Sequence, residues 1–508
     1  MSPNYVELIN RGGRTAPDRT AILFEGASLS FAETHRVTNQ LANVFADKGL
    51  KRGDRLGLLV NNSLYSVPLD FACAKAGLNR VPLNGRLSVS EHARMLQDTD
   101  CKTLVFGPDL EGQAKALKEA VPGLVCLPLG APGAGLLGEA AQASDAEPDV
   151  AVADDDIVLT LFTSGTTGTL KAAQHTQASY AAICRNVLVN LINPAPGDTM
   201  LHAASLIHAS GVFVLPFWLR DARTLIMPHF EPAAYLKAIG DHDVTAINLV
   251  PTMLQMLLGQ PGFDDIANSR LKQVIYGASP MPRPVIKQAM ESWGQHRFWQ
   301  YYGQTECPLA VAVLRPEDHE GDALGACGRP SLDVDIRLVD EDGQDVGEGE
   351  MGEIAVRAPS RMAGYHNAPE LNAEMMLEDG WMRTRDVGRF DERGLLHLMD
   401  RTSDMIITGG YNVYPREVED VLMAHPAVAE CAVVGVKDDK WVEAVTAVVA
   451  LKPDAQVDSD MLTAYVGEKV AAYKRPRRVV FVEAIPKTAV GKINRKAVRD
   501  QLNAAGQT

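Results

Sequence analysis

The chain has 508 residues, of which 46% are hydrophobic and 22% charged, an ordinary composition for a protein that buries a large core in more than one domain. It carries 64 acidic and 49 basic residues, for a formal net charge of −15. This balance excludes a general nucleic-acid-binding protein, which needs a basic face, so anionic ligands would have to be met by local positive sites.

The cysteines and the N-terminus indicate the compartment. The seven cysteines are scattered and form no C-x-x-C pair, so we expect free thiols in a reducing compartment rather than zinc ligands or disulfides. Residues 1–17 lack the apolar segment of a secretion signal, and no apolar run is long enough to span a membrane. We therefore expect a cytoplasmic protein with no transmembrane segment.

Helical and strand patterns alternate over residues 5–150. Segment 30–49 is amphipathic at helical spacing, 65–77 is also predicted to be helical, and both end at a glycine. Short apolar runs that predict strands are 54–60, 79–84 and 103–107. Repeated strand–helix–strand units predict a mostly parallel sheet with helices on its faces. The stretch 130–156, rich in glycine, alanine and acid, indicates a surface excursion.

The alternating pattern resumes at residue 157 and runs to about residue 320. Short strands with Asp-Gly and Arg-Gly turns then predict a small antiparallel β subdomain. After Asp400 a compact α+β unit of roughly 100 residues is predicted, with helices at 415–425, 459–473 and 494–505. We therefore expect an α/β fold. A large N-terminal domain, 1–400, would contain parallel and mixed sheets with helices and the small β subdomain, and a small α+β C-terminal domain, 401–508, would follow.

The run TSGTTGTLK, residues 163–171, directly follows an apolar strand pattern. Glycine lets backbone N–H groups approach a phosphate, hydroxyls donate hydrogen bonds, and a lysine adds positive charge. The run fails the G-x-x-x-x-G-K-[ST] pattern of ATPases, because Leu170 precedes Lys171 and Ala172 follows it. Taken alone, a phosphate loop and a polar turn at a strand end stay equally open.

Four further motifs follow in a fixed order: YYGQTE (301–306), RTRD (383–386), MDRTSDMIITGGYNVYPREVE (399–419) and PKTAVGKINR (486–495). Together with the run above they resemble, over nearly the whole chain, the adenylate-forming (ANL) superfamily. Within it the chain is similar to acyl-CoA synthetases, or carboxylate–CoA ligases, including bacterial benzoate-type (4-chlorobenzoate) CoA ligases and fatty-acyl-CoA synthetases. Single motifs have commoner explanations, such as core tyrosines, surface salt bridges or a solvated lysine, but this set in order is highly specific.

The resemblance implies a site for ATP. Tyr302 would lie against the adenine, Thr305 on the α-phosphate, and Asp386 on both ribose hydroxyls, with Arg401 as a second ribose contact. The residues implied to bind ATP or AMP are Thr163, Ser164, Gly165, Thr166, Thr167, Gly168, Lys171, Gly277, Ala278, Ser279, Tyr302, Gly303, Gln304, Thr305, Asp386 and Arg401. Departures from the family pattern are Leu170 in place of proline, Ala172 and Arg385 in place of glycine, and Ser403 in place of aspartate or lysine.

The resemblance also implies the catalytic and metal-binding groups, Lys492, Glu306, Thr166 and His208. Lys492 would contact the acyl carboxylate and the α-phosphate, because a fixed cation offsets the repulsion between two reacting anions. Glu306 and Thr166 would bind Mg²⁺, which takes hard oxygen ligands.

Two half-reactions are implied. The acid would attack MgATP to give an acyl-adenylate and pyrophosphate, and coenzyme A would then give acyl-CoA and AMP. The C-terminal domain would be a mobile lid that turns at a hinge near Ser403 between the two steps. The residues implied to bind coenzyme A are Gly409, Gly410, Trp441, Tyr473 and Arg475.

The identity of the small-molecule acid is what the sequence defines least. The family pocket nominates His208, Ala209, Ser210, Asn248, Ala278, Tyr301, Gly303 and Leu309, a mixed polar and apolar set that favours a small aromatic, cyclic or short-to-medium-chain acid. The alternative function is a stand-alone adenylation enzyme that loads a carrier protein. Intact Lys492, Glu306 and Asp386 argue against a non-catalytic relative. A homodimer is expected only from the frequency of dimers among soluble enzymes.

Overall fold

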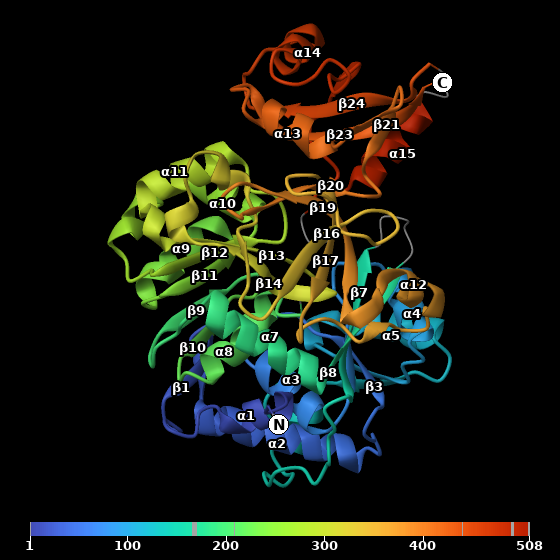
Figure 1. The fold of residues 1–508 in the computed structure, drawn as a ribbon. Coiled ribbons are helices and arrows are strands. Elements are labelled where there is room, and N and C mark those ends of the chain that lie inside the picture. Colours follow the sequence, from blue (N-terminus) through green and yellow to red (C-terminus); the bar gives the residue numbers. More distant parts are fainter. Residues whose placement is uncertain (1, 165–169, 208, 439, 489–491, 506–508) are drawn as a thin grey trace.

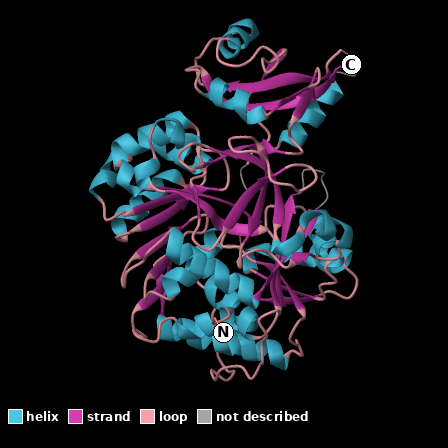
Figure 2. Ribbon diagram, in the orientation of Figure 1, coloured by secondary structure: helices cyan, strands magenta, loops and turns pink. Residues whose placement is uncertain are grey.

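The computed structural model of the chain describes residues 2–164, 170–207, 209–438, 440–488 and 492–505. Within them four β-sheets carry the fold, and helices cover the two largest (Figures 1 and 2). The expected fold class is confirmed, because a large α/β part with mixed sheets and a small antiparallel sheet precedes a smaller α+β part. In Figure 1 the last sheet lies at one end of the molecule, beyond the other three.

The first sheet has nine strands and a parallel centre. In spatial order they are β15 (Arg329–Pro330), β14 (Cys307–Leu314), β13 (Phe298–Gln304), β12 (Gln273–Gly277), β11 (Ala246–Leu249), β9 (Thr199–His202), β10 (Arg223–Ile226), β1 (Thr20–Phe24) and β2 (Ala27–Ser30). The strands from β13 to β1 pair in parallel, and β14, β15 and β2 are antiparallel at the two edges. The hairpin β13–β14 carries the YYGQTE motif at one of these edges.

The second sheet has seven strands in the order β18 (Gly364–Tyr365), β8 (Leu170–Thr176), β7 (Ile157–Ser164), β4 (Asn79–Pro82), β3 (Arg55–Leu59), β5 (Thr103–Phe106) and β6 (Val125–Pro128). Strands β7, β4, β3, β5 and β6 pair in parallel. Strands β7 and β8 pair antiparallel, so the glycine-rich run connects two neighbouring strands at one end of this sheet.

The two remaining sheets are smaller. The third is antiparallel, in the order β16 (Asp335–Val339), β17 (Gly352–Arg357), β19 (Met382–Phe390) and β20 (Leu396–Arg401). The fourth has the order β22 (Tyr411–Val413), β21 (Ile406–Thr408), β24 (Val442–Leu451) and β23 (Val428–Asp438), and β25 (Arg478–Phe481) pairs with β24. The expected β subdomain is therefore confirmed as the third sheet.

The helices begin where the sequence supplies caps. Ser30 Oγ accepts the N–H of Glu33, whose carboxylate accepts the N–H of Ser30, and Ser88 and Glu91 form the same capping box. The helices are α1 (Tyr5–Arg11), α2 (Phe31–Asp47), α3 (Ser66–Lys75), α4 (Val89–Asp98), α5 (Glu111–Ala120), α6 (Gly135–Ala140), α7 (Gln177–Asn190), α8 (Val214–Trp218), α9 (Pro232–Asp241), α10 (Pro251–Leu258), α11 (Arg283–Trp293), α12 (Pro369–Met375), α13 (Pro415–Met423), α14 (Ser459–Gly467) and α15 (Arg495–Ala505). None of the described helices combines the length and the apolar character needed to cross a bilayer.

Two local expectations were wrong. The stretch 130–156 is not wholly a surface excursion, because α6 lies in it and buries Leu136 and Leu137 in a core cluster that also contains residues of α2. Helix α14 ends at Gly467 rather than at residue 473, since glycine is a poor helix former and Arg475 packs closely over this position.

Candidate active site

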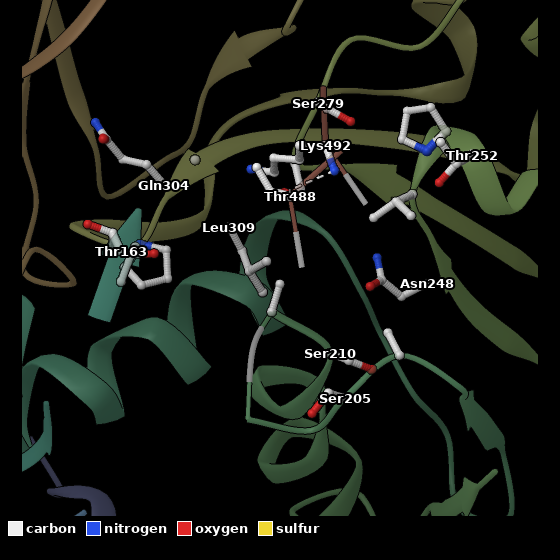
Figure 3. Close-up of a pocket in the computed structure, with 18 of the residues that line it drawn as sticks. Thr163, Ser205, Ser210, Asn248, Thr252, Ser279, Gln304, Leu309, Thr488 and Lys492 are labelled. Carbon is white, nitrogen blue, oxygen red and sulfur yellow. Dashed lines mark hydrogen bonds between the residues drawn. The ribbon is translucent and has the colours of Figure 1, made fainter. Parts of the chain in front are cut away.

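The sequence motifs meet at one large cleft. A cavity of about 1830 Å³ is lined by the hairpins β7–β8 and β13–β14, by strands β19 and β20, and by residues between 487 and 499. Figure 3 shows Lys492 projecting into this cavity near Ser279, with Ser210 and Asn248 on the wall below them. Both the large part and the C-terminal part of the chain therefore contribute to the site.

The two ends of the glycine-rich run lie in the strands of the hairpin β7–β8. Thr163 is opposite Lys171, and its Oγ1 donates to the carbonyl oxygen of Lys171 at 3.5 Å. Lys171 Nζ lies 5.7 Å from the ring centroid of Tyr365, and burial, followed by the charge of Arg385, lowers the pKa of its amine. The candidates Gly165, Thr166, Thr167 and Gly168 lie outside the described residues, as does the side chain of Ser164.

Close backbone packing requires glycine at two positions, at Gly303 in the cavity wall and at Gly277, which precedes the lining residue Ala278. A Cβ on Gly277 would lie 2.5 Å from the carbonyl oxygen of Tyr301, and one on Gly303 would lie 2.4 Å from that of Leu309. Ala278 and Leu309 also have left-handed φ angles of 66° and 60°. The end of β12 therefore packs closely against β13, and the two strands of the hairpin β13–β14 pack closely against each other. The candidate adenine and acyl residues lie in these segments.

A hydrogen-bonded trio with a buried centre joins three strands, and the side chain of its third member, Arg401, is 44% exposed. The hydroxyl of Tyr302 in β13 donates to Asp386 Oδ2 in β19 at 2.7 Å, and Arg401 Nε in β20 donates to Asp386 Oδ1 at 3.2 Å. Tyr302 and Asp386 are buried, and burial, together with the charge of Asp386, raises the pKa of the phenol, which therefore keeps its proton. The structure brings the candidate adenine and ribose residues together.

The side chain of Glu306 is also buried at the cavity wall. Its Oε1 accepts the hydroxyl of Tyr365 at 2.5 Å, and burial, followed by the charge of Glu306, raises the pKa of that phenol. The two residues before Glu306 are fixed as well: Gln304 donates through its amide to a carbonyl of β19, and His175 Nε2 hydrogen-bonds the carbonyl oxygen of Thr305 at 2.8 Å. Tyr365 was not expected from the motifs.

Lys492 is held by a local backbone bridge. Its N–H donates to Thr488 Oγ1 at 3.2 Å, and its carbonyl accepts the N–H of Thr488 at 2.7 Å. The amine is open to the water of the cleft, but crowding protein atoms and the charge of Arg401 lower its pKa, against an opposite effect of Asp386 and Glu306. Lys492 lines the same cavity as the candidate ATP residues Asp386 and Arg401.

The expected acyl pocket contains a buried polar pair. Ser210 Oγ lies 2.9 Å from Nδ1 of His202, and both side chains are buried. Burial lowers the pKa of His202 to about 3, so the imidazole is neutral, and its Nε2 has no hydrogen-bond partner among the described residues. Sequence analysis nominated Ser210 but not His202, which orients it. The candidate His208 lies outside the described residues.

Both polar and apolar side chains make up the rest of the expected acyl pocket. Asn248 donates to a β12 carbonyl at 3.2 Å, and burial raises the pKa of Tyr301 to about 12. Figure 3 shows Ser205 and Thr252 near Asn248, with Leu309 across the cavity. Ala209, Ala278 and Gly303 also line the cavity.

The candidate coenzyme A residues are not brought to the cleft. Gly409, Gly410, Trp441, Tyr473 and Arg475 are all absent from its lining. The ATP candidates and the coenzyme A candidates therefore form two separate groups.

Trp441 organises the coenzyme A candidates. The N–H of Gly409 donates to the Trp441 carbonyl at 2.9 Å, and a Cβ on Gly409 would lie 2.9 Å from the indole ring. The guanidinium of Arg477 lies over this ring, 3.6 Å from the ring centroid. Tyr473 stacks on a tyrosine of β22, Tyr411, with ring centroids 4.6 Å apart.

A cluster of charged residues lies next to the expected hinge. Arg495 Nη2 donates to Glu419 Oε2 at 2.6 Å, and its Nη1 donates to Asp404 Oδ2 at 3.2 Å and lies 3.5 Å from Asp400 Oδ1. Burial and then Glu419 raise the pKa of Asp400 to about 6, although Arg495 opposes this shift. Ser403 itself is exposed between Asp400 and Asp404.

Family models match both parts of the chain. The model described as AMP-binding enzyme matches residues 9–366, and the model described as AMP-binding enzyme C-terminal domain matches residues 417–492.

Individual proteins match over almost the whole length. A feruloyl-CoA synthase of Amycolatopsis sp is 37% identical over 491 residues, 96% of this chain and 97% of that protein. A medium/long-chain-fatty-acid–CoA ligase of Mycobacterium tuberculosis is 36% identical over 479 residues, 91% of this chain and 83% of that protein.

Solved structures share the fold. ATP-bound MatB from Rhodopseudomonas palustris matches with a TM-score of 0.90 at 29% identity, over 99% of both chains. The amide bond synthetase McbA from Marinactinospora thermotolerans matches with a TM-score of 0.88 at 31% identity, over 98% of this chain and 99% of that one.

Proposed function

The chain belongs to the family of AMP-binding enzymes, and on that premise we propose that it is an ATP-dependent carboxylate–CoA ligase that acts through an acyl-adenylate. The overall reaction converts an acid, ATP and coenzyme A to acyl-CoA, AMP and pyrophosphate. The observation that carries the proposal is the position of Lys492, which enters the same cavity as Glu306, Asp386 and Arg401.

In the first half-reaction a carboxylate oxygen of the acid attacks the α-phosphorus of ATP, the bond to the β-phosphate oxygen breaks, and pyrophosphate leaves. Lys492 places a cation where the two anions meet. Tyr302 offers its ring to the adenine, while Asp386 and Arg401 face the ribose. The glycine-rich run 163–171 would bind the departing phosphates, a role for which Thr163 and Lys171 supply the described part.

Magnesium fits this site as a companion of the triphosphate. Glu306 supplies a carboxylate at the cavity wall, and no cluster of three or more histidine, cysteine, aspartate or glutamate side chains suited to a metal occurs among the described residues. Mg²⁺ is commonly held by one or two carboxylates plus substrate phosphates. We propose Glu306 and Thr166 as its protein ligands; when bound, the ion would neutralise phosphate charge.

In the second half-reaction the sulfur of coenzyme A attacks the acyl carbonyl carbon, the bond to the AMP oxygen breaks, and the thiol proton is released. We propose a C-terminal lid domain, 401–508, that turns against the N-terminal domain, 1–400, at Ser403. The separation of the coenzyme A candidates from the cavity supports this turn, because Gly409 and Trp441 do not line the cavity in the present arrangement. His208 would border the acyl group in both steps.

For the acid we propose a small aromatic, cyclic or short-to-medium-chain carboxylic acid. Two relatives have names that overlap this range: a feruloyl-CoA synthase, named for an aromatic acid, and a medium/long-chain-fatty-acid–CoA ligase. Ser210 and Asn248 offer hydrogen bonds in a pocket that Leu309 makes partly apolar, which favours an acid with an oxygen substituent over a plain alkyl chain. We also propose a cytoplasmic enzyme, since its cysteines are free thiols, and a homodimer, for which the frequency of dimers is the only support.

A pyrophosphate-release assay with MgATP and a panel of acids tests the proposal. We expect one acid class to give release that Lys492→Ala abolishes, and we expect coenzyme A to convert a slow burst into steady turnover. Release that coenzyme A leaves unchanged would contradict the acceptor, and a carrier protein and simple amines would be tried in its place. Absence of release with every acid, together with absence of ATP binding, would overturn the proposal.

A further inference from the structure

Arg385 has an unusual backbone conformation for an arginine. Its φ angle is 61°, in the left-handed region that favours glycine, and it lies where the pairing of β17 with β19 shifts register. A bulge of this kind redirects side chains, and a non-glycine residue held at such an angle is often kept for function. Arg385 also lines the large cavity.

The surrounding structure fixes this conformation firmly. The N–H of Arg385 donates to Glu353 Oε1 at 2.8 Å, and its carbonyl accepts the N–H of Thr402 at 3.0 Å. Glu353 is in turn paired with Arg383 at 2.6 Å, so the backbone of Arg385 is tied on both sides without the help of its own charge. The backbone conformation of Arg385 therefore does not depend on its guanidinium.

The present partners of the guanidinium are weak. Nη2 lies 2.7 Å from Oε2 of Glu374, whose side chain is 64% exposed, and Nε lies 3.2 Å from the sulfur of Met375. An ion pair so open to water contributes little, and a thioether is a poor acceptor. A phosphate would be a better partner for the planar fork of an arginine than either of them.

The neighbours of Arg385 indicate which ligand group it would meet. Its partners Glu374 and Met375 belong to helix α12, and Asn372 of the same helix hydrogen-bonds the backbone of Tyr365. Lys171 Nζ lies 5.7 Å from the ring centroid of that tyrosine, and the charge of Arg385, after the effect of burial, lowers the pKa of Lys171. Lys171 belongs to the glycine-rich hairpin and Tyr365 holds Glu306, whereas the next residue, Asp386, turns to Tyr302 and Arg401. Arg385 thus stands on the phosphate side of the ATP site.

We propose that Arg385 binds the β- and γ-phosphates of ATP and the pyrophosphate that leaves, exchanging Glu374 for the polyphosphate when the nucleotide enters. This inference rests on the proposed function. It would explain why the chain holds an arginine at a position whose backbone favours glycine. It also assigns to this residue a share of the phosphate recognition that we propose for the glycine-rich run.

The test uses the full-length enzyme and titration calorimetry with MgATP, magnesium pyrophosphate and AMP. We expect Arg385→Gly and Arg385→Ala to weaken the binding of MgATP and pyrophosphate by about tenfold or more, because a charge-assisted hydrogen bond is lost, and to leave AMP binding within about twofold. Glu374→Gln is expected to tighten MgATP binding, because it releases the guanidinium. Arg389→Gln, an exposed arginine of the same strand outside the cavity, is the matched control and should bind as the wild type does.

Thermal unfolding separates this role from a structural one. Arg385→Gly should unfold at a higher temperature than Arg385→Ala, because only glycine adopts a φ angle of 61° without strain, and yet both should lose the same affinity. Unchanged MgATP affinity in both variants, or an equal loss for AMP, would overturn the inference while the wild type still binds ATP. A wild type that binds neither nucleotide would overturn the proposed function as well.

Discussion

Tyr302 donates its hydroxyl to the buried carboxylate of Asp386, and this 2.7 Å hydrogen bond joins the first sheet to the third at the centre of the site. The two residues are 84 positions apart in the chain. The contact therefore couples the stability of the large part to the shape of the nucleotide site.

Replacing Tyr302 by phenylalanine should lower stability and weaken ATP binding together. The change leaves a buried carboxylate without one donor, which typically costs about 1–3 kcal/mol, and lets Asp386 turn away from the ribose position. Urea unfolding and the KM for MgATP measure the two effects. Tyr235→Phe is the matched control, because that buried hydroxyl has no partner among the described residues and its loss should not destabilise. Equal stability of the two variants would contradict the prediction.

Asp400 should make stability depend on pH. Its pKa is raised from 3.8 to about 6 in the folded chain, so the folded state binds the proton more tightly than the unfolded state does. The contribution of Asp400 to stability is then fully present below about pH 4 and is lost as the pH rises through about 6. Since one unit corresponds to about 1.4 kcal/mol, the loss amounts to about 3 kcal/mol.

Comparison with Asp400→Asn checks this sign. The variant lacks the titrating group, so the stability of the wild type relative to the variant should fall as the pH rises between about 4 and about 6. Urea midpoints of both proteins at several pH values in that window give the difference. A difference that stays constant, or that grows with pH, would show that Asp400 does not titrate in this way.

Removing the indole of Trp441 should affect only the second half-reaction. If coenzyme A stacks its adenine there, Trp441→Ala should raise the KM for coenzyme A by about tenfold, because base stacking on an aromatic ring contributes about 1–3 kcal/mol. Single-turnover formation of the adenylate should remain at the wild-type rate, since Trp441 does not line the cavity. Trp441→Phe should retain most of the affinity. Loss of adenylate formation in Trp441→Ala would contradict the prediction, because it would assign Trp441 to the first half-reaction.

Ser210 should select among acids. Ser210→Ala removes a hydroxyl that His202 orients in the acyl region, so kcat/KM should fall by about threefold to tenfold for acids with an oxygen substituent. Matched acids without that substituent should be unaffected or improved. The ratio of the two values in each protein is the informative measurement. An equal decrease in kcat/KM for both acids would mean that Ser210 supports the structure of the pocket and does not contact the oxygen substituent of the substrate.

Much of the fold could be predicted because its signals are local. Helix α2 has an amphipathic pattern, a capping box at Ser30 and Glu33 and a glycine soon after its end, so its bounds differ little from the expected 30–49. Helix α6 was missed because six residues of mostly glycine, alanine and leucine, with no capping hydrogen bond, give no helical signature.

Sequence analysis could predict only those site residues that lie in a recognisable motif. Tyr302, Asp386 and Arg401 could be nominated, but the bonds between them depend on the register of three strands, which no local pattern contains. Tyr365 carried no motif, although it holds Glu306 from another sheet. Arg477, whose guanidinium lies over Trp441, was not nominated, because the basic run that contains it gives no signal for the ring that it reaches.

The burial of the cysteines has a consequence for the chemistry of the enzyme itself. An acyl-adenylate is a mixed anhydride that acylates any accessible thiolate. Cys327 lines the cavity and Cys307 begins β14, but both side chains are buried, and burial raises their pKa values to about 11 and about 12, so both thiols stay protonated. Burial thereby keeps these two sulfur atoms out of competition with the incoming acceptor, and the enzyme avoids acylating them with its own intermediate.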